Sequence, residues 1–251
     1  MWILLLPLAL AGPLQDSPRE PIVVSEVLAV ERLGERSRSA VYTDALEAQL
    51  ARGTWSYPAA GDSIRSTTGD ERTWSRVEAA EDGWFSGRAF RGGWAVARVE
   101  VAEAGAWRLD LSGASAVYVD GAPHAGDIYR LGLTRIPLPL AAGTHELLFR
   151  GGRGSLRAVL EPAPAVVYLE GRDRTLPDVL QGRGGELLLG QIVANATAYP
   201  APGLAVVARA GGVETRTELP TLGPASFRKC AVRVGVPVAH AGDTLPVELT
   251  L

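Results

Sequence analysis

The sequence has very little cysteine and no long apolar run. Cys230 is the only cysteine among the 251 residues, which excludes an intrachain disulfide and a multi-cysteine metal site. The formal net charge of −3 argues against a nucleic-acid-binding surface over the whole chain. Lys229 is the only lysine, but arginine is spread along the sequence, so this bias carries no functional signal. A composition of 47% hydrophobic and 21% charged residues indicates a folded chain.

The N-terminus begins with the apolar segment Trp2–Ala11, which has about ten residues. A membrane-spanning helix needs roughly 20 apolar residues, so this segment is too short to be one. Ala9-Leu10-Ala11 supplies the small residues that signal peptidase prefers, and residues 1–11 are predicted to be a signal peptide. The alternative is a buried first strand. A cleaved signal implies a secreted, periplasmic or cell-surface protein without a membrane span in its mature chain.

Residues 12–53 are predicted to be a leader that ends in one short helix. The leader, to roughly Arg38, is rich in proline, glutamate and arginine and is expected to be mobile after cleavage. In the helix, Thr43 is expected to be the N-cap, and Glu47 has the negative charge that the first turn favours. Gly53 is expected to end the helix.

After this helix, alternation with period two replaces helical periodicity. In Trp107–Leu111 apolar and charged residues alternate strictly, which predicts a strand with one solvent-exposed face. Ser115–Val119 runs into Asp120-Gly121, a pair that favours a hairpin because both turn positions need positive φ. Ile136–Leu140 contains two prolines and is predicted to be an edge strand. Short strands at this spacing predict a jelly-roll sandwich over residues 54–162.

A second series of strands follows the stiff segment Glu161–Pro164. About five strands in this length are typical of a small immunoglobulin-like sandwich. Residues 166–251 are therefore predicted to form such a domain, and the whole chain is predicted to be all-β. The last residue is an apolar strand residue, which favours a fragment of a longer polypeptide over a complete edge strand. The predicted strands are Glu186–Ala194, Gly203–Ala210, Val213–Leu219, Ser226–Val234 and Thr244–Leu251.

Several turn-and-strand motifs resemble a known family. Val117–Tyr129, Leu147–Gly154 and Phe227–Lys229 are similar to the N-terminal β-region of secreted bacterial prolyl-oligopeptidase-like α/β-hydrolase proteins. The resemblance covers roughly residues 45–251 and implies an accessory β-region ahead of a catalytic domain. The first domain also resembles the galactose-binding-like jelly rolls attached to glycoside hydrolases, where a Val-x-Val-(Asn/Asp)-Gly turn recurs. Asp120 stands where asparagine is common in that turn.

The sequence departs from this family because it has no hydrolase domain. A nucleophile elbow needs Gly-x-Ser-x-Gly, and the nearest segment, Gly113–Val117, lacks the second glycine. His124, His145 and His240 are interpreted as turn or strand-end residues rather than as catalytic bases. Cys230 is interpreted as a buried structural cysteine rather than a reactive thiolate. No catalytic residue and no cofactor is therefore predicted, and the chain is not expected to be an enzyme by itself.

Three weak binding signals remain in the first predicted domain. Tyr118, Tyr129 and Arg130 are candidate contacts to a sugar at one end of the jelly roll. Asp120 and Asp127 are candidate oxygen ligands for a structural Ca²⁺, although both residues are also good turn formers, and that interpretation is preferred. The third signal is a cluster of aromatic residues between positions 55 and 94. These rings either form a carbohydrate platform or, as preferred, fill the core of the sandwich and pack the helix onto it.

The preferred functional hypothesis is a non-catalytic accessory β-region of an exported hydrolase. Its partner is then the catalytic domain of the same polypeptide, downstream of residue 251. The alternative is a stand-alone extracytoplasmic carbohydrate-binding protein with a polysaccharide as its partner. A stand-alone enzyme is the third hypothesis. Nucleic acid is not an expected partner in any of them.

Overall fold

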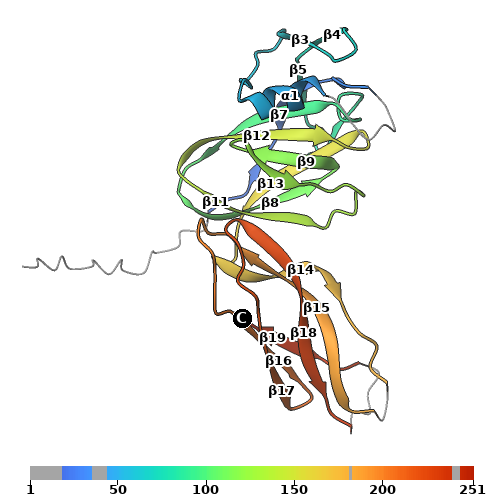
Figure 1. Ribbon diagram of the computed structural model, residues 1–251, viewed down its shortest axis with the longest axis vertical. Helices are drawn as coiled ribbons and strands as arrows, with labels where there is room; N and C mark the ends of the chain where they lie inside the picture. Colours follow the sequence, from blue (N-terminus) through green and yellow to red (C-terminus); the bar gives the residue numbers. More distant parts are fainter. Residues whose placement is uncertain (1–18, 36–43, 181–182, 239–243) are drawn as a thin grey trace, which may run out of the picture.

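The computed structural model describes residues 19–35, 44–180, 183–238 and 244–251. Strands dominate these residues, and their only helix is α1 (Ala45–Arg52). The strands form antiparallel sheets that pack in pairs, with one pair on each side of residue 164 (Figure 1). The all-β prediction is confirmed. The predicted signal peptide, residues 1–11, lies outside the described residues, and among the described helices none is long and apolar enough to cross a membrane.

The first sandwich consists of two antiparallel sheets with one hydrophobic core between them. One sheet has the order β1-β13-β8-β11, with β6 pairing to β13, and the other has the order β10-β9-β12-β7-β2-β5. Phe85, Phe149 and Leu109 are fully buried in the core between them. The strands are β1 (Ile22–Val23), β2 (Glu26–Val30), β5 (Ser75–Glu78), β6 (Phe85–Ser86), β7 (Trp94–Val101), β8 (Gly105–Ser112), β9 (Ala114–Val119), β10 (Ala122–Ala125), β11 (Thr134–Leu140), β12 (Gly143–Gly151) and β13 (Ser155–Pro162).

Two local predictions for this sandwich are confirmed. Strand β11, with its two prolines, is at the edge of its sheet, where the missing backbone donors break no ladder on the free side. Asp120 and Gly121 connect β9 to β10 with φ values of 48° and 82°, the positive angles that a two-residue hairpin turn requires.

The predicted mobile leader is partly wrong, because residues 22–30 belong to the first sandwich. Strand β1 pairs with β13, and β2 lies between β5 and β7 in the other sheet. Val24 and Val27 are 2% exposed and pack into the core. The sequence around these strands is rich in proline and charge, but a few apolar residues at the right spacing are enough to add strands to a sheet that already exists.

A third layer covers the outer face of the sheet that contains β7. It consists of α1 and the hairpin of β3 (Ser63–Arg65) and β4 (Glu71–Thr73), shown at the top of Figure 1. Trp74 and Trp94, 3% and 0% exposed, pack between this layer and the sheet. Strand β7 is therefore buried on both faces in its first half, which explains its unbroken apolar sequence. These two tryptophans pack the helix onto the sandwich, as the preferred interpretation of the aromatic residues expects.

Helix α1 begins one residue later than predicted. Its N-cap is Asp44, whose Oδ1 accepts hydrogen bonds from the backbone N–H groups of Leu46 and Glu47. The same oxygen accepts the indole N–H of Trp94 at 3.1 Å, so the cap also fixes the helix to the sheet. The proposed N-cap Thr43 lies outside the described residues. Gly53 ends the helix with φ of 66°, as predicted.

The second sandwich packs two three-stranded sheets around a smaller core. The sheets have the orders β14-β15-β18 and β17-β16-β19, and buried valines such as Val193, Val206 and Val232 fill the space between them. Five of its strands fall where they are predicted, and β14 is an additional one. The strands are β14 (Val167–Thr175), β15 (Gly185–Asn195), β16 (Ala205–Ala210), β17 (Val213–Glu218), β18 (Ser226–Val236) and β19 (Val247–Thr250).

Candidate functional site

The three predicted sugar contacts do not lie together. Tyr118 is on β9 and packs its ring 6.0 Å from the ring of Trp94, on the outer face of the sheet. Tyr129 is 69% exposed in the loop between β10 and β11. The neighbouring Arg130 places its guanidinium 5.6 Å from the ring of Trp84. A single site that contains all three side chains is therefore not formed.

Asp120 and His145 form a pair at the tip of the β9–β10 hairpin. The Asp120 carboxylate lies 2.6 Å from Nδ1 of His145 and accepts the backbone N–H of Glu146. Nε2 of His145 lies 2.9 Å from the carbonyl oxygen of Ala141. Burial disfavours the charged imidazole, but the Asp120 carboxylate and the Ala141 carbonyl outweigh it and raise the pKa of His145. Both ring nitrogens face acceptors, so this histidine stabilises the hairpin and has no nitrogen free to act as a base.

Asp127 lies at the other end of the same hairpin, after β10. It is 6% exposed, and its two carboxylate oxygens accept the backbone N–H groups of Leu131 and Gly132. The length of the hairpin separates this carboxylate from that of Asp120. In the described ranges, no group of three histidine, cysteine or acidic side chains is placed to hold a metal ion. Both aspartates act as turn formers, which is the role preferred for them from the sequence.

Three further residues with reactive side chains are interpreted from the sequence as non-catalytic: His124, Cys230 and His240. His124 is on β10 rather than in a loop, and burial lowers its pKa. Cys230 is 7% exposed in the core of the second sandwich, and burial raises the pKa of its thiol, so the prediction of a buried structural cysteine is confirmed. His240 lies outside the described residues.

An aromatic groove separates the α1 layer from the β9–β10 hairpin. It has a volume of about 460 Å³, and Trp55 and Tyr118 line it together with the carboxylate-bearing Glu47. The indole N–H of Trp55 donates to Glu146 at 2.6 Å, which holds the ring in place. Glu47 is paired with Arg150. The groove therefore combines fixed aromatic faces with hydrogen-bonding groups, but it contains only Tyr118 of the predicted contacts.

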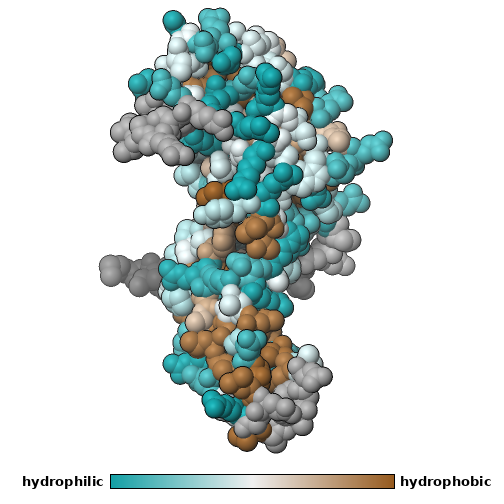
Figure 2. Space-filling model, turned by 90° about the vertical axis from the view of Figure 1, so that its right-hand side faces the viewer, coloured by the Kyte–Doolittle hydropathy of each residue, from teal (hydrophilic) through white to brown (hydrophobic). Residues whose placement is uncertain are grey.

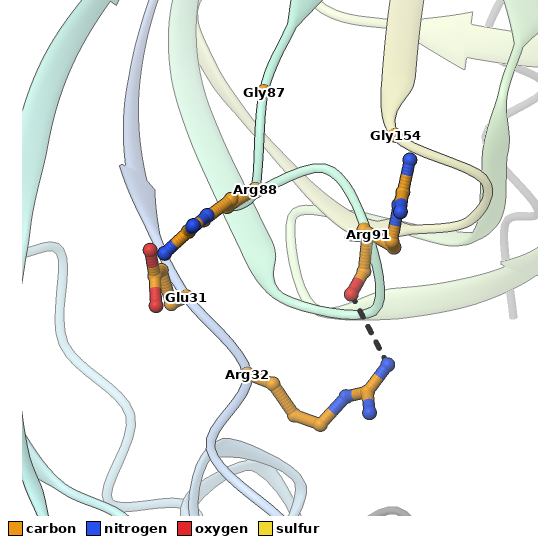
Figure 3. A pocket seen from close by; sticks show the side chains of 6 residues that line it. All are labelled: Glu31, Arg32, Gly87, Arg88, Arg91 and Gly154. Carbon is orange, nitrogen blue, oxygen red and sulfur yellow. Dashed lines mark hydrogen bonds between the residues drawn. The ribbon is translucent and has the colours of Figure 1, made fainter.

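An arginine pocket lies elsewhere on the first sandwich. Arg32, Arg88 and Arg91 line it with Glu31 and two glycines, around a volume of about 580 Å³ (Figure 3). The residues come from three separate segments: the end of β2, the turn after β6 and the turn between β12 and β13. Nη2 of Arg32 donates to the carbonyl oxygen of Arg91 at 3.1 Å. Sequence reasoning missed this pocket because arginine is common everywhere in the chain and only the fold brings these three together.

Six charged side chains meet where the two sandwiches touch. Glu170 on β14 is 3% exposed and lies 3.2 Å from Nη1 of Arg135 and 3.8 Å from Nη1 of Arg108. Arg172, also on β14, lies 2.9 Å from the carboxylate of Asp110 on β8. Arg108 also pairs with Glu161 at 2.8 Å. These residues, which we call the junction network, comprise three positive and three negative side chains, so their formal charges balance.

The junction network corrects one prediction from the sequence. The polar face of Trp107–Leu111 is expected to be exposed to solvent, yet Asp110 on that face is only 5% exposed. The face is covered because β14 packs against β8 and β11 at the junction (Figure 1). Beside the network, Tyr168 packs against Ala106 and Ala194 in a small apolar cluster. Burial, followed by the nearby Glu170 charge, raises the pKa of Tyr168 to about 12.

Comparisons with known proteins give only remote similarities. No family model matches the chain, and no curated protein matches its sequence. Similar solved structures include a GH2 β-galacturonidase from Eisenbergiella tayi, with 16% identity, a TM-score of 0.36 and coverage of 93% of this chain and 41% of that one. An exo-chitosanase from Amycolatopsis orientalis has 10% identity, a TM-score of 0.34 and coverage of 92% and 29%. A β-glucuronidase from Bacteroides uniformis has 12% identity, a TM-score of 0.34 and coverage of 88% and 28%.

The chain thus spans about two fifths or less of each of these three glycoside hydrolases. None of the three is a prolyl-oligopeptidase-like protein, so that part of the predicted resemblance has no support. With TM-scores below 0.5, the similarity assigns no function to this chain. What the fold defines is a class: a protein of two antiparallel β-sandwiches joined through a charged junction.

The Asp120–His145 pair gives the protein a defined pH dependence. Because the pKa of His145 is raised in the folded state, the pair stabilises the fold below the unfolded pKa of about 6.5, and this stabilisation is lost as pH rises through the folded pKa. Asp120→Asn keeps the turn preference and an oxygen acceptor but removes the charge. Urea unfolding is expected to show the wild-type protein more stable than this variant at about pH 5.5, by less than about 1 kcal/mol. At about pH 8.5 this gap closes; a gap that stays constant with pH contradicts the assignment.

Proposed function

We propose that this chain is a non-catalytic β-region of an exported hydrolase, and that it holds a catalytic domain of the same polypeptide in place. The junction network is the observation that carries the proposal. Domains joined by a linker move relative to one another unless their interface fixes them. Three ion pairs cross this junction, Arg108–Glu170, Arg135–Glu170 and Arg172–Asp110, and they are satisfied in one relative orientation. A fixed orientation is what a positioning region needs.

The second sandwich also presents an apolar surface suited to contact with another domain. Leu176, Leu180 and Leu188 are 69%, 59% and 59% exposed. Figure 2 shows hydrophobic residues gathered over this part of the molecule, whereas hydrophilic residues cover most of the first sandwich in the same view. Exposed apolar surface of this kind marks interaction sites in soluble proteins. In the proposed polypeptide, the catalytic domain packs against this surface.

The proposal is tested on the natural gene product. Its reading frame is expected to continue past codon 251 into a hydrolase domain. In that full-length protein, Leu180→Asp combined with Leu188→Asp is expected to open the interface between the second sandwich and the hydrolase domain. The reason is that the closed interface would bury two charges without partners. Limited proteolysis is expected to cut the double variant at least several-fold faster than the wild-type protein.

The matched control is Ile128→Asp combined with Leu131→Asp, which places the same two charges on side chains of the first sandwich that are 56% and 65% exposed. This variant is expected to be cut at the wild-type rate. A stop codon directly after codon 251 contradicts the proposal, and so does a leucine double variant that is cut no faster than the control.

The aromatic groove favours a second candidate function, carbohydrate binding. Rigid aromatic faces beside hydrogen-bonding groups suit the apolar faces and hydroxyl groups of a sugar ring, and Trp55, Tyr118 and Glu47 provide this combination in the groove. A stand-alone binding protein has this function without a downstream domain, whereas a positioning region requires that domain. Carbohydrate binding by this chain therefore distinguishes the two hypotheses.

Tyr118→Ala is expected to weaken binding to a neutral polysaccharide by about three- to tenfold, because the variant loses one stacking face. Affinity electrophoresis against a panel of neutral polysaccharides measures this effect. Tyr129→Ala serves as the control, because Tyr129 is exposed but lies outside the groove. Failure of the wild-type protein to bind any neutral polymer, or equal losses in the two variants, contradicts this second function.

A further inference from the structure

The arginine pocket has a rigid frame. Between Gly87 and Gly154 the backbone is tied by hydrogen bonds from Gly87 N–H to the Gly154 carbonyl and from Gly154 N–H to the Phe90 carbonyl. The Phe90 ring is 1% exposed and packs 5.7 Å from the ring of Phe85 in the core. The turn that contains Phe90 is therefore anchored to the sandwich, and Arg88 and Arg91 extend from it on either side of that anchor.

Close packing also fixes the third arginine. A Cβ atom on Gly92 would lie 2.5 Å from Nη2 of Arg32, and the φ of Gly92 is +77°. A side chain at position 92 would thus push the Arg32 guanidinium out of its place. Gly92 leaves room for this guanidinium, and the hydrogen bond from Arg32 to the carbonyl of Arg91 holds it next to the anchored turn. Three arginines from two segments therefore line one pocket, and the anchored turn fixes the backbone from which Arg88 and Arg91 extend.

Among the described lining residues, the positive charge of the pocket exceeds the negative charge. Arg88 extends toward Glu31 in Figure 3, but within the described ranges neither Arg88 nor Arg91 forms an ion pair or a hydrogen bond through its side chain. Glu31 is the only acidic residue of the described lining, against three arginines. Elsewhere in the molecule arginines do find carboxylates, as the junction network shows. The pocket therefore has the charge and the donors to bind an oxyanion.

The remaining lining narrows the class of ligand. The described lining contains no aromatic ring on which a nucleic-acid base could stack and no apolar side chain that could take a lipid chain. The Glu31 carboxylate is an acceptor for hydroxyl groups of a ligand, and the volume of about 580 Å³ is in the range of small-ligand sites. We propose that the arginine pocket binds an acidic polysaccharide through its carboxylate or sulfate groups, with Arg88 and Arg91 as the principal donors. This proposal depends neither on the positioning role nor on the aromatic groove.

The test measures binding of the purified chain to polygalacturonate, dextran sulfate and neutral dextran at low ionic strength by isothermal titration calorimetry. The wild-type protein is expected to bind at least one of the acidic polymers and not dextran. Binding to polygalacturonate alone identifies the carboxylate as the recognised group, and binding to dextran sulfate alone identifies the sulfate. Arg88→Gln combined with Arg91→Gln is expected to weaken this binding at least about tenfold, because two charge-assisted donors are lost. Glu31→Gln is expected to strengthen it, because the only opposing charge of the described lining is removed.

The matched control is Arg174→Gln combined with Arg228→Gln, which removes the same charge from exposed positions of the second sandwich. Thermal unfolding verifies that all variants are folded. Equal losses in the two double variants overturn the proposal, since binding then follows net charge alone. It is also overturned if the wild-type protein binds neither acidic polymer, or if single-stranded DNA or anionic phospholipid vesicles bind more tightly than both.

Discussion

The structure depends on the pairing of Glu170 and Asp110 with arginines across the junction between the sandwiches. Both carboxylates are nearly inaccessible to water, at 3% and 5% exposure. A buried carboxylate without a partner costs several kcal/mol, and breaking a buried ion pair from one side typically costs about 3–5 kcal/mol. A rotation of one sandwich against the other that separates Glu170 from Arg135, or Asp110 from Arg172, loses these ion pairs and incurs such a cost wherever the carboxylate stays buried. The network thereby selects one arrangement of the two sandwiches rather than adding to stability in general.

The two sandwiches, held in this arrangement, present different kinds of surface. The first sandwich carries the α1 layer, the aromatic groove and the arginine pocket, all of which present polar or charged groups beside a rigid frame. The second sandwich carries the exposed leucines and has the smaller core. A protein built in this way is suited to bind a polar ligand at one end and to contact another domain at the other. This division links the two proposals, although each has its own test.

Much of the fold could be predicted from the sequence, because local rules decide many of its elements. Asp120-Gly121 specifies a hairpin, the prolines of Ile136–Leu140 restrict that strand to an edge, and Gly53 ends the helix. Elements that depend on tertiary contacts were not predictable in this way. Strand β14 contains Glu170 and Arg172, whose charges suggest a solvated segment until their partners on β8 and β11 are known. The arginine pocket is hidden for the same reason, since Arg32 is far in the sequence from Arg88 and Arg91.

The central claim, that the junction network fixes the two sandwiches, is tested most directly by a distance measurement across the junction. Spin labels at Thr144→Cys and Glu214→Cys, in a Cys230→Ala background, report the distance between β12 of the first sandwich and β17 of the second. The account predicts one narrow distance distribution by double electron–electron resonance, and a clearly broader one when Glu170→Ala is added. A broad distribution in the labelled parent protein would contradict it, as would an equally narrow one after Glu170 is removed.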